Sequence, residues 1–338
     1  MVQTPPHRRR PRYSGKYPRR FEEKYKELEN RPETVAKVLA SGKTPAGSHV
    51  PIMVEEILEV LHPQPGEIIV DCTLGHGGHA SAMLPFIQPD GLLLGLDVDP
   101  VELPRTGARL ATLGLGSETL RIRKSNFAGL PAAMVAEGME GADCILADLG
   151  VSSMQLDTPG RGFSTKTAGP LDMRMNPQRG LSAAGLLKKI QSSALETLLR
   201  ENADEPHAGR IATALAGKDF ALTTDLANAV RSELASIPPE DIEKSVRRVF
   251  QAIRIEVNEE FSALDAFLRN LPGCLKPGGR AVILTFHSGE DRRVKKAFQS
   301  GFRAGVYSRI ADNVTRPTPA ECHANPRATS AKLRWVIR

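Results

Sequence analysis

Four short segments that read as strands alternate with helical segments between residues 68 and 148, and this alternation constrains the fold more than any other feature. The four segments are residues 68–70, 92–96, 120–123 and 143–147. Strands that alternate with helices in this way predict a parallel sheet in an α/β protein. Asp71, Asp97 and Asp148 directly follow three of these segments. Because ligands of open α/β sheets bind beyond the carboxyl ends of the strands, these acids predict a ligand site at one edge.

A glycine-rich turn follows the first predicted strand. It reads GHGGHA from Gly75 onward and satisfies the GxGxx[G/A] pattern, and Asp97 lies 22 residues after Gly75, where an acid meets ribose hydroxyls. The glycines let the backbone approach a ligand, so the pattern fits a dinucleotide or S-adenosylmethionine. Asp71 favours S-adenosylmethionine, because a carboxylate suits a positively charged amino group and would repel a pyrophosphate. Asn126 and Phe127, after the third strand, offer an amide and a ring for adenine.

The segment 148–175 is too polar and too rich in glycine and proline to belong to the core. Long loops in compact domains are usually functional, and a surface excursion is the alternative. Its candidate substrate contacts are Arg161 and Arg174 for phosphates and Phe163 for a stacked base. His287 follows a strand expected at residues 281–286 and is a further candidate for substrate contact.

The alternation of strands and helices stops after this loop. Residues 182–236 predict several short helices, a long helix is expected over residues 242–271, and a last strand is expected at residues 332–338. The predicted organisation has three parts. They are a disordered basic tail (1–48), an α/β domain (49–155 and 242–338) and an inserted helical domain (156–241).

The charge is unevenly distributed. The formal net charge is +6, and residues 1–20 contain seven arginines and lysines without an acid, so the body is close to neutral. The tail is either an arm for phosphate backbones or an idle solvated extension. No apolar run suits a membrane span and no secretory signal is present, which predicts a cytoplasmic protein. The cysteines form no CxxC pair, and His76 and His79 lack a third ligand at suitable spacing, so no metal is expected.

Seven motifs together resemble the signatures of one family. In chain order they are DCTLGHGGHA, DLGVSSMQLD, RGFS, GPLDMRMN, FQAIRIEVNEE, TFHSGEDRRVK and NPRATSAKLR. They resemble the bacterial ribosomal RNA small-subunit methyltransferase H family, also called MraW, over residues 49–338, with only the basic tail outside. The resemblance implies a class I Rossmann-like methyltransferase with a mostly parallel sheet and an inserted all-helical domain, which helps to recognise RNA. It also implies S-adenosylmethionine-dependent methylation of the exocyclic N(4) amine of a cytidine in the decoding region of 16S ribosomal RNA.

The resemblance further implies the cofactor contacts. They fall on Gly77, Gly78, His79, Asp97, Phe127, Asp148 and Gln155. Asp148 is also the candidate catalytic residue, because a carboxylate at this strand end can hold either the target amine or the cofactor. The chain departs from the family in its long tail, at Gly289, where leucine is usual, and at Ala328 and Thr329, where serine and arginine are usual.

Two other functions stay open. The glycine pattern also permits a nicotinamide-dependent oxidoreductase, and a non-catalytic RNA-binding assembly factor can keep the same fold. The partner that the resemblance implies is 16S ribosomal RNA in the small ribosomal subunit, with no membrane. A homodimer is left open.

Overall fold

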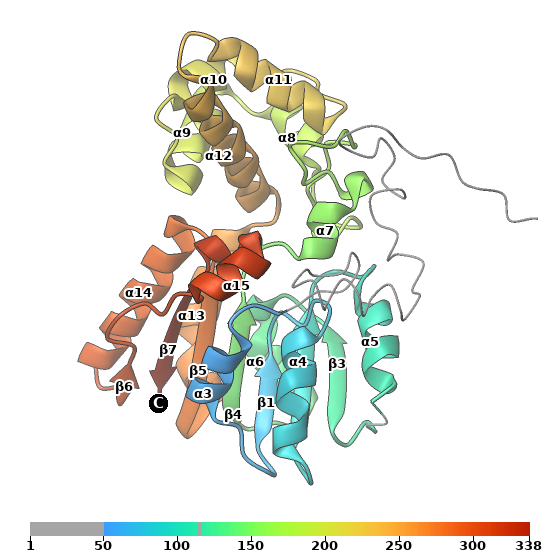
Figure 1. The fold of residues 1–338 in the computed structure, drawn as a ribbon, viewed down its shortest axis with the longest axis vertical. Helices are drawn as coiled ribbons and strands as arrows, with labels where there is room; N and C mark the ends of the chain where they lie inside the picture. Colours follow the sequence, from blue (N-terminus) through green and yellow to red (C-terminus); the bar gives the residue numbers. More distant parts are fainter. Residues whose placement is uncertain (1–50, 114–115) are drawn as a thin grey trace, which may run out of the picture. The chain divides into compact units, whose positions relative to one another are not determined.

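The computed structural model describes residues 51–113 and 116–338 of the protein (Figure 1). The basic tail expected at residues 1–48 lies outside the described residues. Within them, a seven-stranded sheet carries helices on both faces, and a second group of helices packs around a core of its own. No helix in this part of the chain is long and apolar enough to cross a membrane.

The sheet has the strand order β3-β2-β1-β4-β5-β7-β6. The strands are β1 (Ile68–Asp71), β2 (Leu92–Asp97), β3 (Leu120–Lys124), β4 (Ala142–Asp148), β5 (Leu275–Thr285), β6 (Arg309–Ile310) and β7 (Lys332–Ile337). β1 to β5 pair in parallel, whereas β7 runs antiparallel to both β5 and β6. The mostly parallel sheet confirms the predicted α/β fold. The strand order reverses beside β1 and β4, which is where open α/β sheets form ligand sites.

Successive residues of the central strands face two different apolar cores. In β4, Ile145 and Ala147 join one core, whereas Cys144 and Leu146 join the other. The first core is completed by α6 (Leu130–Ala136), α13 (Glu260–Cys274) and α14 (Ser288–Arg303). The second is completed by α3 (Val54–Leu61), α4 (Gly78–Met83), η2 (Leu84–Ile87) and α5 (Leu103–Ala111). Because helices cover both faces, these strands are apolar throughout, which makes them recognisable in the sequence.

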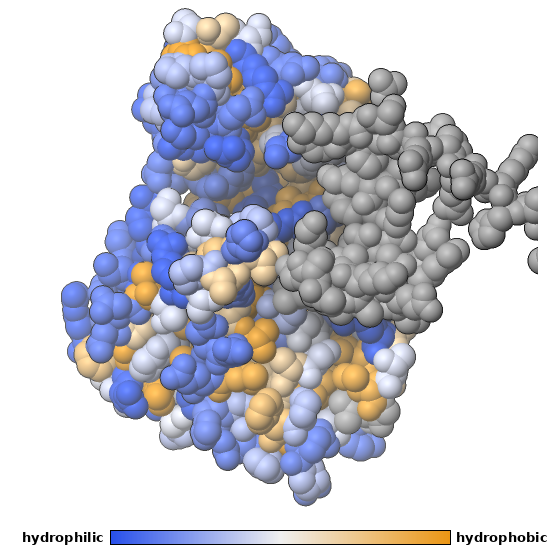
Figure 2. Space-filling model, viewed as in Figure 1, coloured by the Kyte–Doolittle hydropathy of each residue, from blue (hydrophilic) through white to orange (hydrophobic). Residues whose placement is uncertain are grey.

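A separate helical core follows the loop that leaves β4. Its helices are α8 (Ala183–Lys189), α9 (Ser192–Ala203), α10 (Ala208–Leu215), α11 (Thr223–Glu233) and α12 (Pro239–Val257). Leu171 and Met173 of the loop are buried among them. α12 extends past residue 241, the predicted end of the helical insertion, and buries Val246 and Ile253 in this core. On the face drawn in Figure 2, hydrophilic residues predominate over these helices.

The single helix expected over residues 242–271 is in fact two helices, α12 and α13 (Figure 1). They are separated at Asn258 and Glu259, and Glu259 has a left-handed φ of 52°. The apolar periodicity continues across the break, so the sequence pattern does not reveal it. The break arises because the two helices serve different cores: Ile253 packs in the helical core, whereas Leu264 packs against the sheet. α13 also continues through Pro272 to Cys274, beyond residue 271, where the helix was expected to end.

The left-handed conformation of Glu259 predicts that glycine is tolerated at this position. We expect Glu259→Gly to change the free energy of unfolding by less than about 0.5 kcal/mol, because glycine adopts a positive φ without steric cost and this offsets its extra entropy in the unfolded chain. The measurement is urea-induced unfolding followed by circular dichroism.

Glu256→Gly is the matched control, because Glu256 is an exposed residue in the last turn of α12. Glycine there should cost about 1 kcal/mol. Equal losses in the two variants would contradict the role of the positive φ at the break.

Candidate active site at the carboxyl edge of the sheet

Three acids meet where neighbouring strands end. Asp71, Asp97 and Asp148 close β1, β2 and β4, and β1 lies between the other two strands. The shared edge that the sequence predicts is therefore present. Asp71 is only 1% exposed, and its side chain accepts a hydrogen bond from the backbone N–H of Thr73 at 3.1 Å.

The glycine turn after β1 is fixed to the end of β2. Gly75 and Gly77 have φ values of 48° and 67°, a left-handed conformation that favours glycine. The N–H of Gly75 donates to Asp97 Oδ2 at 2.7 Å. A side chain on Gly77 would lie 3.0 Å from Leu110 Cδ1, and one on Gly78 would lie 3.1 Å from the ring of Pro51. The turn thus needs its glycines for its conformation and for close packing against Leu110 and Pro51.

A buried imidazole lies beside the acids. His79 Nε2 is 2.9 Å from the carbonyl oxygen of Ile52, and its Nδ1 is 3.7 Å from Asp148 Oδ2. Because a carbonyl can only accept, Nε2 carries a proton and the ring is held with Nδ1 toward Asp148. Burial lowers the pKa of His79, although Ile52 and the charge of Asp71 oppose the shift.

All three carboxyl groups hold their protons unusually tightly, because burial raises the pKa of Asp97 as well as those of the other two. Burial raises the pKa of Asp148 to about 7, and the negative charge of Glu290 adds to the shift. Burial also raises the pKa of Asp71 to about 6, against the opposing charge of His79. Asp148 Oδ1 is buried without a hydrogen-bond partner among the described residues. A cation or a hydrogen-bond donor placed at this edge would compensate the buried carboxylate, so the site is suited to a positively charged ligand.

Asp99 was not predicted as a site residue, yet it is the centre of a buried network. Its Oδ2 accepts from Gln155 Nε2 and from Arg161 Nη1, both at 2.8 Å. Gln155 also closes a capping box with Ser152 at the start of α7 (Ser153–Asp157), which fixes both ends of its amide. The position of Asp99 in the sequence, two residues after the strand-end acid Asp97, could have marked it as a site residue. In the structure its N–H donates to Asp97 Oδ1 at 2.8 Å.

The predicted substrate contacts in the loop have partners within the chain. Arg161 is bound to Asp99, and Arg174 makes two bonds to Asp172, at 2.7 and 2.8 Å. Phe163 is only 7% exposed in the helical core, which leaves its ring without an open face for a stacked base. Its neighbours glycine and serine gave no sign of this burial. Phe127 is half-buried, with its ring in an edge-to-face contact with Phe267 at 5.6 Å.

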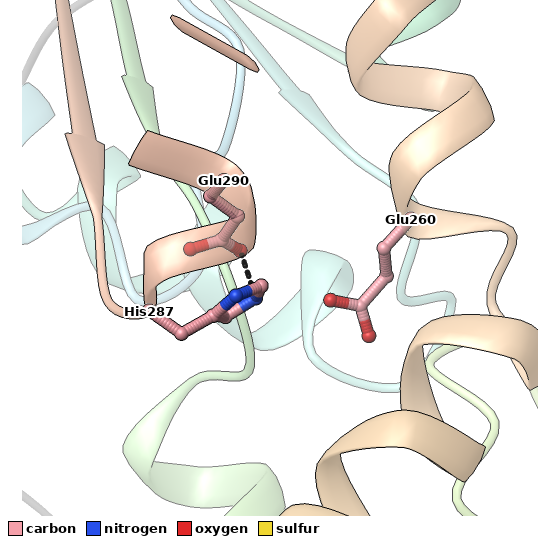
Figure 3. A group of neighbouring side chains, drawn as sticks. All are labelled: Glu260, His287 and Glu290. Atoms are coloured by element: carbon pink, nitrogen blue, oxygen red, sulfur yellow. Dashed lines mark ion pairs between the residues drawn. The ribbon is translucent and has the colours of Figure 1, made fainter. Parts of the chain in front are cut away.

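His287 belongs to a cluster of charged side chains after β5 (Figure 3). Its Nε2 lies 3.2 Å from Glu290 Oε1, and the carboxylate of Glu260 faces the same space. Arg254 donates to both oxygens of Glu260 at 2.8 Å. Burial raises the pKa of Glu290, but His287 and Arg254 outweigh burial and hold that pKa below its usual value. Arg254 thus pairs with Glu260, and His287 lies beside Glu290. The three residues drawn in Figure 3 are also a set that can ligate a cation.

The departures from the family pattern have a local explanation only in part. A side chain at Gly289 would lie 2.6 Å from Phe261 Cζ, so the usual leucine would require Phe261 to move. Ala328 is fully buried, and Thr329 is exposed.

Comparisons with known proteins agree with the motifs. A sequence model of the family described as the MraW methylase family matches residues 46–338. The chain is 48% identical to ribosomal RNA small subunit methyltransferase H 1 of Lachnoclostridium phytofermentans, over 99% of this chain and 94% of that protein. It is 50% identical to ribosomal RNA small subunit methyltransferase H 2 of Alkaliphilus metalliredigens, over 98% and 97%. Both alignments extend into residues 1–48, so the prediction that the tail lies outside the resemblance is wrong for these relatives.

The raised pKa of Asp148 predicts a stability cost in the free protein. Because the folded-state pKa of about 7 exceeds the ordinary value of 3.8, wild-type stability should fall as the pH rises from 4 to 7. We expect Asp148→Asn to remove this loss and to be about 1–3 kcal/mol more stable than wild type at pH 8, with little difference at pH 4. Chemical unfolding at a series of pH values measures the difference.

Asp90→Asn is the control, because Asp90 is exposed and should give parallel curves for variant and wild type. A difference between Asp148→Asn and wild type that does not depend on pH would show that the Asp148 carboxyl is not strained by burial.

Proposed function

The chain belongs to the MraW methylase family, and we propose that it transfers a methyl group from S-adenosylmethionine to the N(4) amine of a cytidine in 16S ribosomal RNA. The observation that carries the proposal is the buried, unpartnered oxygen of Asp148 beside Asp71 and Asp97. Such an edge attracts a cation, and S-adenosylmethionine carries a sulfonium and an ammonium group. The same edge repels the pyrophosphate of a nicotinamide cofactor, which disfavours an oxidoreductase.

The cofactor would lie along the carboxyl ends of β1, β2 and β4. The backbone of Gly77 and Gly78 borders it at the turn, and the Asp97 carboxylate is placed for the ribose hydroxyls. Phe127, in the loop after β3, offers a ring edge toward adenine. Asp148, His79 and Gln155 complete the proposed contacts. Bound in this way, the cofactor supplies an electrophilic methyl group.

Asp148 has a second proposed role toward the target base. The cytosine amine is a weak nucleophile, because its lone pair is delocalised into the ring. An acceptor aimed at the amine's N–H would orient the lone pair toward the methyl group and take up the positive charge that develops there. The Asp148 carboxylate can accept the amine's proton through Oδ1, which has no hydrogen-bond partner among the described residues. The base must be unpaired or flipped out of a helix to reach this edge.

The RNA is proposed to contact the segment 148–175 and the helical core. The side chain of Arg174 is 22% exposed and is the proposed phosphate contact of the loop. His287 is the proposed contact on the β5 side, since the charge of its partner Glu290 reaches Asp148. The small ribosomal subunit and a cytoplasmic location follow from this substrate. A non-catalytic assembly factor is disfavoured, because it would gain nothing from a buried carboxylate oxygen that lacks a hydrogen-bond partner.

Methyl transfer to ribosomal RNA tests the proposal. Purified protein with radiolabelled S-adenosylmethionine should label small-subunit RNA, and mass mapping should place the methyl group on a cytidine N(4). Asp148→Asn should lower the rate at least about 100-fold, because the amide cannot accept the proton. Asp90→Asn, at an exposed turn, should keep the wild-type rate.

Wild-type turnover by a folded Asp148→Asn variant would remove Asp148 from the reaction. Binding of NADH without binding of S-adenosylmethionine in equilibrium dialysis would overturn the assignment of the cofactor.

A further inference from the structure

Arg161 lies at the junction of two hydrogen-bonded segments. Its Nη1 donates to Asp99 Oδ2 at 2.8 Å, and its Nη2 donates to the carbonyl oxygens of Met175 at 2.8 Å and Arg174 at 3.2 Å. One guanidinium therefore joins the loop after β2 to the far end of the segment 148–175. The side chain is 12% exposed, so these bonds are largely shielded from water.

The network continues from Asp99 to the proposed cofactor edge. Asp99 shares its Oδ2 between Arg161 and Gln155, and Oδ1 accepts the N–H of Val101 at 2.9 Å. The N–H of Asp99 donates to Asp97 Oδ1, and the N–H of Gly75 donates to Asp97 Oδ2. Arg161 is thus connected through charged hydrogen bonds to the β2 acid and to the glycine turn.

In the other direction the network reaches the break between α12 and α13. Asn258 Oδ1 accepts the N–H of Met175 at 2.7 Å, and its Nδ2 donates to the carbonyl oxygen of Met173 at 2.8 Å. Residues 173–175 are therefore held from both sides, by Arg161 and by Asn258. Met173 itself has a left-handed φ of 61°, a conformation that needs such support in a residue other than glycine.

We propose that Arg161 is a positioning residue for the proposed methyl transfer and not a phosphate ligand. Arg161 holds Gln155 in place through Asp99, and it binds the carbonyl oxygens of Arg174 and Met175. It thereby fixes the position of the loop proposed to contact RNA relative to the proposed cofactor site. A phosphate could take this guanidinium only by displacing Asp99, which would leave a carboxylate of 1% exposure without its cation. The inference rests on the proposed function for its kinetic test, but its structural test does not.

The kinetic test compares Arg161→Met, Asp99→Asn and the double variant. If the two residues act as one unit, each single variant and the double variant should lose a similar factor in kcat/KM for RNA, about ten- to a hundredfold. The dependence of RNA affinity on salt should keep the wild-type slope, because no phosphate contact is lost. Arg161→Lys should restore little, since a single ammonium cannot reach both the carboxylate and the carbonyls. Arg105→Met, an exposed arginine on α5, is the control and should match wild type.

Hydrogen exchange gives the structural test. The N–H of Met175 should exchange at least about tenfold faster in Arg161→Met and in Asp99→Asn than in wild type and Arg105→Met, because local opening becomes easier.

A phosphate contact would instead lower the slope of RNA affinity against salt concentration by about one in Arg161→Met, while Asp99→Asn bound RNA normally, and this result would overturn the proposal. Unchanged exchange at Met175 would overturn it as well. A wild-type protein without methyl transfer would refute the proposed function and leave the exchange result to decide the positioning role.

Discussion

The burial of negative charge at the carboxyl edge is the constraint on which the rest of the structure depends. Asp71 is buried and Asp148 is largely buried, and both hold their protons at pH values where exposed carboxyl groups are ionised. This arrangement costs stability in the free protein, because the carboxylates are incompletely paired. A cationic methyl donor would relieve that cost on binding. The strain at the edge is therefore best explained as a feature retained for ligand binding, in the same place where the strand order reverses.

The sheet, with a core on each face, and the separate helical core have different tasks. The sheet and its helices hold the acids in register, because parallel strands bring their carboxyl ends to one edge. The helical core surrounds the loop that leaves β4 and returns through α12 to the break at Asn258 and Glu259. Hydrogen bonds, and not apolar packing alone, connect the cofactor edge with this loop. Asp99 and Arg161 make that connection, which is why the loop does not behave as an independent surface excursion.

The strands, the glycine turn and the three strand-end acids could be predicted from the sequence, because a sheet covered on both faces produces apolar segments that end abruptly. The break in the long helix could not, since apolar periodicity is the same whether α12 and α13 face one core or two. The partners of Arg161 could not be predicted either, because an arginine beside glycines is equally consistent with a bound phosphate and with an internal ion pair. Phe163 shows the same limit: its polar neighbours indicated exposure, whereas tertiary packing buries it.

Proton release on cofactor binding tests the central claim most directly. Isothermal titration calorimetry of S-adenosylmethionine at pH 6.5, repeated in buffers with different ionisation enthalpies, measures how many protons leave the complex. If the ligand's positive charge is compensated by Asp148 and Asp71, binding should lower their pKa and release about 0.5–1 proton, and Asp148→Asn should release clearly fewer. Binding without proton release in the wild-type protein would contradict the account.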